Sequence, residues 1–308
     1  MSKKTRNLLL RLACLLLIGG LLSGCMVGET SSRREITSAA PAASETAAPS
    51  QAEPAASSQT ETIATVEPQT CFTYDGLTVT ATGLENSLLG SQLNLQIDNQ
   101  SKSDYTVSCE AVIVNDCMIT DLFSSTVAAG KQAITELDLL SSELEAAGIH
   151  GIGQIEVYFY VLNPSTYDRV YEADCVTIQT SQYGAVSEDP VTGTELYNAN
   201  GVRILGQYVN ENTFWGSSVL LYVENHSGRA VTVSADDLSV NGKMMTALFS
   251  ATVYDGKKSF DNITLLSTEL EKNGISKIQD VELKFQIWDA NTYETIAESG
   301  AVSFQVSP

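Results

Sequence analysis

The stretch that decides the fold reads IEVYFYVL at residues 155–162, and a related stretch reads VELKFQIW at residues 281–288. In both stretches the odd positions are apolar, whereas the even positions are freer to change. A period of two with one apolar face is typical of a strand that is buried on one side. Each stretch therefore predicts a half-buried strand of a β-sheet.

The two stretches belong to a long internal repeat. Residues 99–180 align without a gap on residues 225–306 at a constant offset of 126, and 32 of these 82 positions are identical. Each copy is long enough to bury a core of its own, so the repeat indicates a duplicated domain rather than a solenoid.

The pattern of short strands indicates the fold class. Further strand candidates in the first copy are bounded by Gly, Asn, Asp or Ser and lie at residues 77–84, 93–97, 105–114, 133–139, 166–171 and 175–180. About seven antiparallel strands in a unit of this size predict an all-β fold of two tandem immunoglobulin-like β-sandwich domains.

One short connecting helix is expected in each copy. Ser142 and Glu145, with Thr268 and Glu271 in the second copy, have the spacing of a capping box. Gly148 and Gly274 stand where such a helix would end in a left-handed residue. The helix is interpreted as a structural crossover.

The N-terminal residues indicate export. Four basic residues within residues 3–11 precede an apolar run at residues 12–22, which is too short to span a bilayer as a permanent helix. The run ends in Leu22-Ser23-Gly24-Cys25. This ending resembles the lipobox of bacterial lipoproteins, which implies that Cys25 carries a diacylglycerol and becomes the first residue of the mature chain. The alternative is an ordinary signal peptide with a fortuitous cysteine.

The composition divides the chain further. Residues after Cys25 are rich in Ala, Ser, Thr, Pro and Glu and hold almost no large apolar side chains, which predicts a disordered stalk. The predicted organisation is a lipoprotein signal peptide at 1–24, the lipidated cysteine and stalk at 25–70, a first sandwich at 71–180, a linker at 181–193 and a second sandwich at 194–308.

The charge of the chain restricts its partners. Removing residues 1–24 takes away four of the 17 Lys and Arg and none of the 37 acidic residues, which leaves 13 basic residues and a net charge of −24. Nucleic-acid binding depends on clustered basic residues, so no nucleic-acid partner is expected. Anionic lipid headgroups would also repel such a surface. We therefore expect the lipid on Cys25 to attach the protein to the outer face of the cell membrane.

Several short motifs occur in both copies: Asn-x-Ser turns at residues 99–101 and 225–227, Val-Asn pairs ending at Asn115 and Asn241, Gly-Lys pairs at 130–131 and 256–257, and Thr-Tyr pairs at 166–167 and 292–293. With these motifs the copies resemble a domain that is common in lipoproteins of clostridia and related Gram-positive bacteria and has no known function. The resemblance implies an extracytoplasmic location and an immunoglobulin-like shape, and it brings no active site with it.

Residue types that carry catalysis are scarce. The chain has only His150 and His226, which stand at non-equivalent positions of the two copies, and it contains no GxSxG, P-loop, HExxH or EF-hand pattern. Asp236, Asp237 and Asp255 could touch a calcium ion, but a solvated strand end is the favoured interpretation. The sequence therefore predicts no catalytic residues, no metal and no cofactor.

Four cysteines lie in the first copy. Cys71, Cys109 and Cys175 have apolar counterparts in the second copy, which predicts that they point into the core, whereas a lysine replaces Cys117 and predicts exposure. Free thiols are favoured, and a disulfide between Cys109 and Cys175 remains the alternative, since exported chains can form one.

The best candidates for partner binding are apolar loop tips. Leu88-Leu89 and Phe214-Trp215 occupy the same place in each copy, in a turn just before a strand. The alternative is that these side chains fold back and close the end of the sandwich. Tyr158 and Tyr160, which face away from the predicted core, are a second candidate, with cross-strand packing under a neighbouring loop as its alternative.

The sequence thus predicts a non-enzymatic envelope protein. Its duplicated domains are expected to bind a protein or glycan partner. The alternative is a structural spacer or accessory protein without a defined pocket. An enzyme is the least favoured class.

Overall fold

The computed structural model describes residues 33–38, 64–120, 123–213 and 215–307. The predicted signal peptide, Cys25, Phe214 and most of the predicted stalk lie outside these residues. Within the described ranges, no helix has the length and hydropathy that a membrane span requires.

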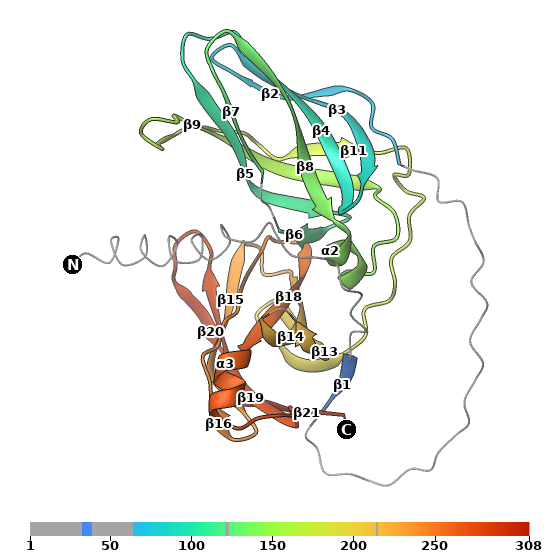
Figure 1. Cartoon of the computed structure of the whole chain (residues 1–308), viewed down its shortest axis with the longest axis vertical. Helices are drawn as coiled ribbons and strands as arrows, with labels where there is room; N and C mark the ends of the chain where they lie inside the picture. Colours follow the sequence, from blue (N-terminus) through green and yellow to red (C-terminus); the bar gives the residue numbers. More distant parts are fainter. Residues whose placement is uncertain (1–32, 39–63, 121–122, 214, 308) are drawn as a thin grey trace. The chain divides into compact units, whose positions relative to one another are not determined.

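The first domain is a sandwich of two antiparallel sheets (Figure 1). One sheet has the order β2-β3-β4-β8, with β2 (Gln69–Tyr74), β3 (Leu77–Ser87), β4 (Gly90–Asn99) and β8 (Lys131–Leu140). In the other, β5 (Tyr105–Val114) pairs with β9 (Gln154–Leu162). This central pair is extended by β6 (Cys117–Ile119), β7 (Ser124–Val127), β10 (Arg169–Glu172) and β11 (Val176–Gln179).

The second domain repeats these elements in the same order. Its first sheet contains β12 (Thr194–Ala199), β13 (Val202–Thr213), β14 (Gly216–Asn225) and β18 (Lys257–Leu266). Its second sheet contains β15 (Val231–Val240), β16 (Lys243–Met244), β17 (Ser250–Val253), β19 (Asp280–Asp289), β20 (Thr295–Glu298) and β21 (Val302–Val306).

The strand order is immunoglobulin-like in both domains. In the first domain β3, β4 and β8 follow the A-B-E order of an immunoglobulin sheet, and β10 or β11, β9 and β5 follow the G-F-C order of the opposite sheet. The predicted fold class is therefore confirmed.

Alternating apolar residues fill each core. In β9 the side chains of Ile155, Val157, Phe159 and Val161 are at most 1% exposed, and the four equivalent residues of β19 are fully buried. Full burial of one such side chain contributes about 1.5–3 kcal/mol. The period of two in the sequence thus marks the inner face of a central strand in both domains.

The short helices α2 (Ser141–Ala146) and α3 (Ser267–Lys272) lie between the last strand of one sheet and the central strand of the other. Gly148 has a φ of 65° at the end of α2, and the amide of Ile149 donates to Leu144 O at 2.8 Å, as expected for a glycine-ended helix. The predicted capping box is wrong, because the helix begins two residues earlier than a Ser142 N-cap requires, directly after β8. Its N-cap residue is Leu140, which has no side-chain acceptor.

Part of the predicted stalk is folded. Arg33–Ser38 form strand β1, which pairs with β13 and β21 of the second domain. Composition did not reveal this strand because five of its six residues are polar or charged. The first domain also begins before residue 71, since Ala64 and Val66 are buried in its core and β2 begins at Gln69.

The exposure predicted for two cysteines is wrong. Cys117 is 1% exposed, because β6 pairs with β18 of the second domain and is covered by it. This burial raises the pKa of the Cys117 thiol to about 12. Cys175 lies just before β11 and is exposed, whereas Cys109 is buried, and the alternative Cys109–Cys175 disulfide is not formed.

A largely covered lysine joins the two domains at the same place. Lys257 Nζ lies 2.6 Å from Asp116 Oδ1 and also contacts the carboxylate of Glu156, and its side chain is 15% exposed. Burial opposes the charge on Lys257, but the two carboxylates outweigh it and raise its pKa. The first domain thus supplies the counter-charges for a cation of the second.

Candidate binding surfaces

The apolar tips identified in the sequence lie at the ends of two equivalent hairpins. Leu88 is 85% exposed and Leu89 57% exposed between β3 and β4, and Trp215 is 49% exposed between β13 and β14. Leu88 and Leu89 thus do not fold back to close the sandwich, whereas about half of the Trp215 side chain is covered. Whether they bind a partner remains a prediction.

A glycine in each tip allows the backbone to lie close against the neighbouring strand. Gly90 has a φ of 142°, and a Cβ built on it would lie 2.2 Å from Leu139 O. Gly216 has a φ of 136°, with Leu265 O 2.4 Å from the same position. A side chain at either position would clash with the neighbouring strand, so the hairpin ends are held close against β8 and β18.

Each tip is also bonded to the helix that follows the neighbouring strand. The amide of Ser141 in α2 donates to Leu89 O at 2.9 Å, and the amide of Ser267 in α3 donates to Trp215 O at 2.8 Å. A backbone hydrogen bond therefore links the tip to the beginning of the helix in both domains.

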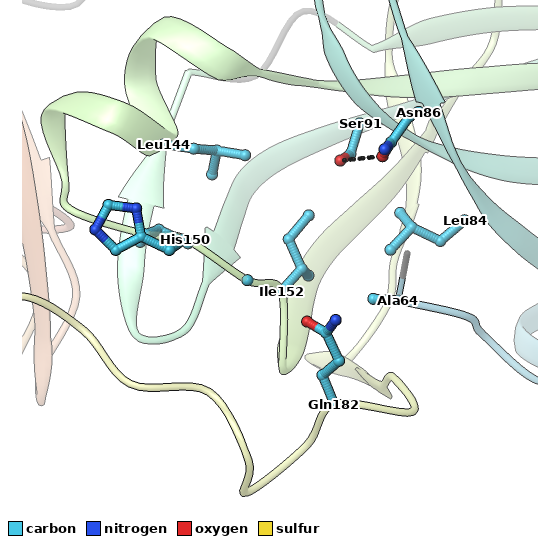
Figure 2. A pocket seen from close by; sticks show the side chains of 10 residues that line it. Ala64, Leu84, Asn86, Ser91, Leu144, His150, Ile152 and Gln182 are labelled. Atoms are coloured by element: carbon cyan, nitrogen blue, oxygen red, sulfur yellow. Dashed lines mark hydrogen bonds between the residues drawn. The ribbon is translucent and has the colours of Figure 1, made fainter. Parts of the chain in front are cut away.

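A small cleft lies beside this tip and helix in the first domain, with a volume of about 110 Å³. Figure 2 shows Leu144 of α2 and Ile152 of the following loop on its apolar side, with Asn86, Ser91 and Gln182 as polar lining. Ser91 Oγ donates to Asn86 Oδ1 at 3.3 Å. His150 lies at the rim, with Nε2 2.8 Å from Asp189 Oδ2.

The second domain has a cleft of about 300 Å³ at the same place. Six lining positions of one cleft correspond to six of the other at the offset of 126. They are Ser91 and Ser217, Leu144 and Leu270, Ile149 and Ile275, His150 and Ser276, Gly151 and Lys277, and Ile152 and Ile278.

The two clefts differ in charge. The first is lined by amide and hydroxyl groups with one histidine, whereas the second contains Glu211, Glu271 and Lys277. Arg34 of β1 neutralises Glu211 at 2.5 Å. The duplicated position is therefore shared, but the chemistry that it would present to a partner has diverged.

The candidate tyrosines of β9 have partners within the protein. The ring of Tyr158 meets that of Tyr254 edge to face, with 4.9 Å between centroids, and Tyr254 belongs to the second domain. The guanidinium of Arg169 lies 3.9 Å from the centre of the Tyr160 ring. This placement favours the packing alternative for both residues.

The repeated sequence motifs are structural. Asn99 Nδ2 donates to Ser103 O and Val127 O at 2.8 and 3.0 Å, and Asn225 repeats the arrangement with Arg229 O and Val253 O. Asn115 and Asn241 in turn accept amides from the loop that precedes the central strand. These residues fix turns rather than form a binding site.

The candidate acids and histidines are distributed over separate surfaces. Asp236 accepts from Gln286, Asp237 pairs with Lys284, and Asp255 accepts the amide of Gly228. His150 and His226 are both largely exposed. Over the residues that the structure describes, no group of three or more metal-ligating side chains comes together.

Sequence reasoning missed the clefts, although a signal for them exists. Leu144, Ile149 and Ile152 are identical in the second copy, and each is less than 10% exposed. Apolar residues that are identical in both copies are normally expected in the core. That these three lie at the edge of a cleft depends on the loop geometry, which the sequence pattern does not describe.

Comparisons with known proteins give no family. No protein-family model and no characterised protein matches the chain. Among solved structures, matches occur with the exo-β-D-glucosaminidase CsxA in an inhibition study (12% identity, TM-score 0.22) and with the exo-chitosanase CsxA of Amycolatopsis orientalis (11% identity, TM-score 0.21). They cover 73% and 76% of this chain but only 26% of the enzyme. At these scores the likeness carries no argument about function.

Proposed function

We propose that this chain is a lipid-anchored envelope protein whose two sandwich domains bind a protein or glycan partner without catalysis. In this proposal Cys25 carries the anchor, and each hairpin tip with its adjacent helix and cleft forms one binding surface. The second surface includes Trp215 and carboxylates, and the first includes Leu88 and Leu89.

The observation that carries the proposal is the exposure of large apolar side chains at the same place in both domains, on tips that are hydrogen-bonded to the following helix. Exposed aromatic and aliphatic anchors on ordered loops are typical of recognition surfaces. The entropy cost of ordering such a tip on binding is reduced, because its backbone is already hydrogen-bonded to the helix.

The size of the clefts favours an extended partner over an enclosed small molecule. Pockets that enclose small ligands typically measure about 300–1,000 Å³. The first cleft is well below this range and the second is at its lower limit. A protein loop or one or two sugar units laid across the tip and the cleft would fit better.

A pull-down from envelope extract tests the binding surface. The bait is the chain from Met26 onward, beside a variant with Leu88, Leu89 and Trp215 changed to Ser. We expect a partner that is retained by the native bait and at least about tenfold depleted by the variant, since loss of one interface anchor commonly costs 2 kcal/mol or more.

A matched control separates the tips from general hydrophobicity. Ile134 is 77% exposed and Met244 64% exposed on other surfaces, so a bait with both changed to Ser should retain the partner. Equal loss with both variants, or no enriched partner with any bait, would contradict a tip-directed binding function.

The anchor has its own test. Replacing Cys25 with Ser should abolish incorporation of a labelled fatty acid and shift the protein from the membrane fraction to the medium, because attachment would depend on acyl chains alone. Undiminished labelling in this variant would place the lipid elsewhere or refute lipidation at Cys25.

A spacer remains the second candidate, and the salt-bridged contact between the domains favours it. Lys257, Asp116 and Glu156 join the two sandwiches. A spacer made of two domains would need such a junction to keep the domains together. The pull-down distinguishes the two functions.

A further inference from the structure

Strand β1 occupies a slot between two sheets of the second domain. Arg33, Arg34 and Glu35 pair with Asn210, Val209 and Tyr208 of β13, and the next three residues pair with Val306, Gln305 and Phe304 of β21. The strand changes sheets at its centre. Although it is short, the strand therefore covers an edge of both sheets.

Ile36 holds the strand in the core. It is 6% exposed, and a Cβ built on Gly206 would lie 3.1 Å from its Cδ1. The first domain has Ala81 at the position equivalent to Gly206, in the matching register with its outer strand. The second domain thus lacks a methyl group where Ile36 is seated.

Arg34 closes the end of the slot. Its guanidinium donates to Ser307 O at 2.6 Å, Ile278 O at 2.8 Å and Glu211 Oε1 at 2.5 Å, and its side chain is 9% exposed. Three acceptors from separate segments converge on one buried cation. Recognition of the strand is therefore specific for arginine at this position.

The first domain fills its equivalent slot with the residues that immediately precede it. Val66 bridges Thr180 as Ile36 pairs with Val306, and Ser181 donates to Thr65 O at 2.8 Å as Ser307 donates to Glu35 O at 2.8 Å. Residues 64–66 thus do in the first domain what residues 34–36 do in the second.

The segment just before the second domain is directed elsewhere. Glu188 bridges Ile149 and Asp189 bonds to His150, so both contact the first domain. Pro190 has no amide hydrogen to donate to a neighbouring strand. The slot is consequently filled by residues from a distant part of the sequence: Arg34 and Ser307, which are hydrogen-bonded to each other, are 273 positions apart.

We propose that this slot binds an extended peptide that has an arginine two residues before a buried isoleucine, and that Arg33–Ser38 of the same chain is its ligand. This segment, called the strap below, then tethers the second domain to the anchor. The tethering depends on the proposed lipidation of Cys25. Only seven residues lie between Cys25 and Arg33, and the eight Cα–Cα steps that join them limit their distance to about 29 Å. The second domain, although it follows the first in the sequence, is then the domain that is tethered directly to the anchor.

A chain cut after folding tests the strap. A specific protease site is inserted within residues 39–63 of the chain from Met26 onward, and the cut protein is examined by size exclusion at micromolar concentration. We expect the N-terminal fragment to elute with the body. A labelled peptide of residues 31–40 should displace it.

Matched peptides show that the slot is responsible, with the protein itself unchanged. A peptide with Ile36→Asp should compete at least about tenfold more weakly than the native peptide, because a charge would enter the core. A peptide with Thr37→Asp should compete normally, since Thr37 is exposed. Separation of the fragment from the native body, or equal competition by the Ile36→Asp peptide, would overturn the proposal.

The membrane arm uses the lipid-bearing chain on neutral phosphatidylcholine vesicles. After the cut, the body should remain on the vesicles through β1 alone and be released by the native peptide. Immediate release on cutting would overturn the strap. If the uncut chain forms a dimer in which β1 is cross-linked to a second copy, the proposal that β1 binds the slot of its own chain would be overturned. Failure of the uncut chain to bind vesicles, with peptide exchange intact, would refute the anchor and the tethering but not the slot.

Discussion

Asn99 and Asn225 show how a single polar residue can define a domain edge. Each is fully buried, and each side chain bonds backbone groups on two different segments. A buried amide side chain whose hydrogen bonds are all formed is stabilising. Without it, the backbone groups that it bonds would be left unpaired and poorly accessible to water. This explains why the Asn-x-Ser motif occurs in both copies.

Replacing Asn225 with Ala should lower the free energy of unfolding by about 2–4 kcal/mol, because Arg229 O, Val253 O and the amide of Ser227 lose their partner together. Urea denaturation followed by tryptophan fluorescence measures this change. Asn198 is exposed and serves as the control, with an expected effect within about 0.5 kcal/mol for Asn198→Ala. Similar losses in both variants would contradict a structural role specific to Asn225.

At the level of elements, the connecting helix is tied to the opposite loop by a carboxylate. Glu269 in the first turn of α3 accepts the amide of Thr246 at 2.8 Å and its hydroxyl at 2.7 Å. Glu143 of α2 accepts the amide of Thr120 at 2.8 Å. The same contact therefore positions the helix, and with it the cleft, in both domains.

This contact makes the stability of the second domain depend on pH. The amide and hydroxyl of Thr246 lower the pKa of Glu269 below its ordinary value of 4.5. A lowered folded-state pKa stabilises the fold above the ordinary value, and the contribution is lost as pH falls through the folded-state pKa. We expect Glu269→Gln to lower Tm at pH 6, and the difference from the native chain to shrink as pH approaches 3. A constant difference over this range would contradict the assignment.

The sequence predicted those elements whose signal is local and repeated. Alternation in residues 155–162 and 281–288 identified the central strands, and the duplication confirmed which face is buried. Strand β1 was missed because pairing across the chain, and not its own hydrophobicity, makes it a strand. Cys117 was misplaced for a related reason, since its burial comes from β18 of the other domain. The apolar tips were found, but the clefts beside them depend on loops that no period describes.

For the whole molecule, we expect the junction at Lys257 to couple the unfolding of the two sandwiches. Lys257→Gln should lower the free energy of unfolding by about 1–2 kcal/mol, because Glu156 would keep a largely buried charge without its partner. It should also speed proteolysis within residues 181–193. Lys131 is the equivalent residue of the first domain and is exposed, so Lys131→Gln should change neither quantity. Unchanged proteolysis of the Lys257→Gln variant would show that the salt bridge does not couple the domains.

The position of β1 has a consequence for biosynthesis. A ribosome makes residues 33–38 first among the described strands and β21 last, so this segment must wait without its partners for almost the entire time of synthesis. In the first domain, residues 64–66 find their partners once Thr180 and Ser181 have been made, whereas in the second domain β1 must close a loop of 273 residues. A chain shortened at its C-terminal strand would therefore leave β1 without half of its partners. Completion of the second domain thus depends on the first and the last of the described strands.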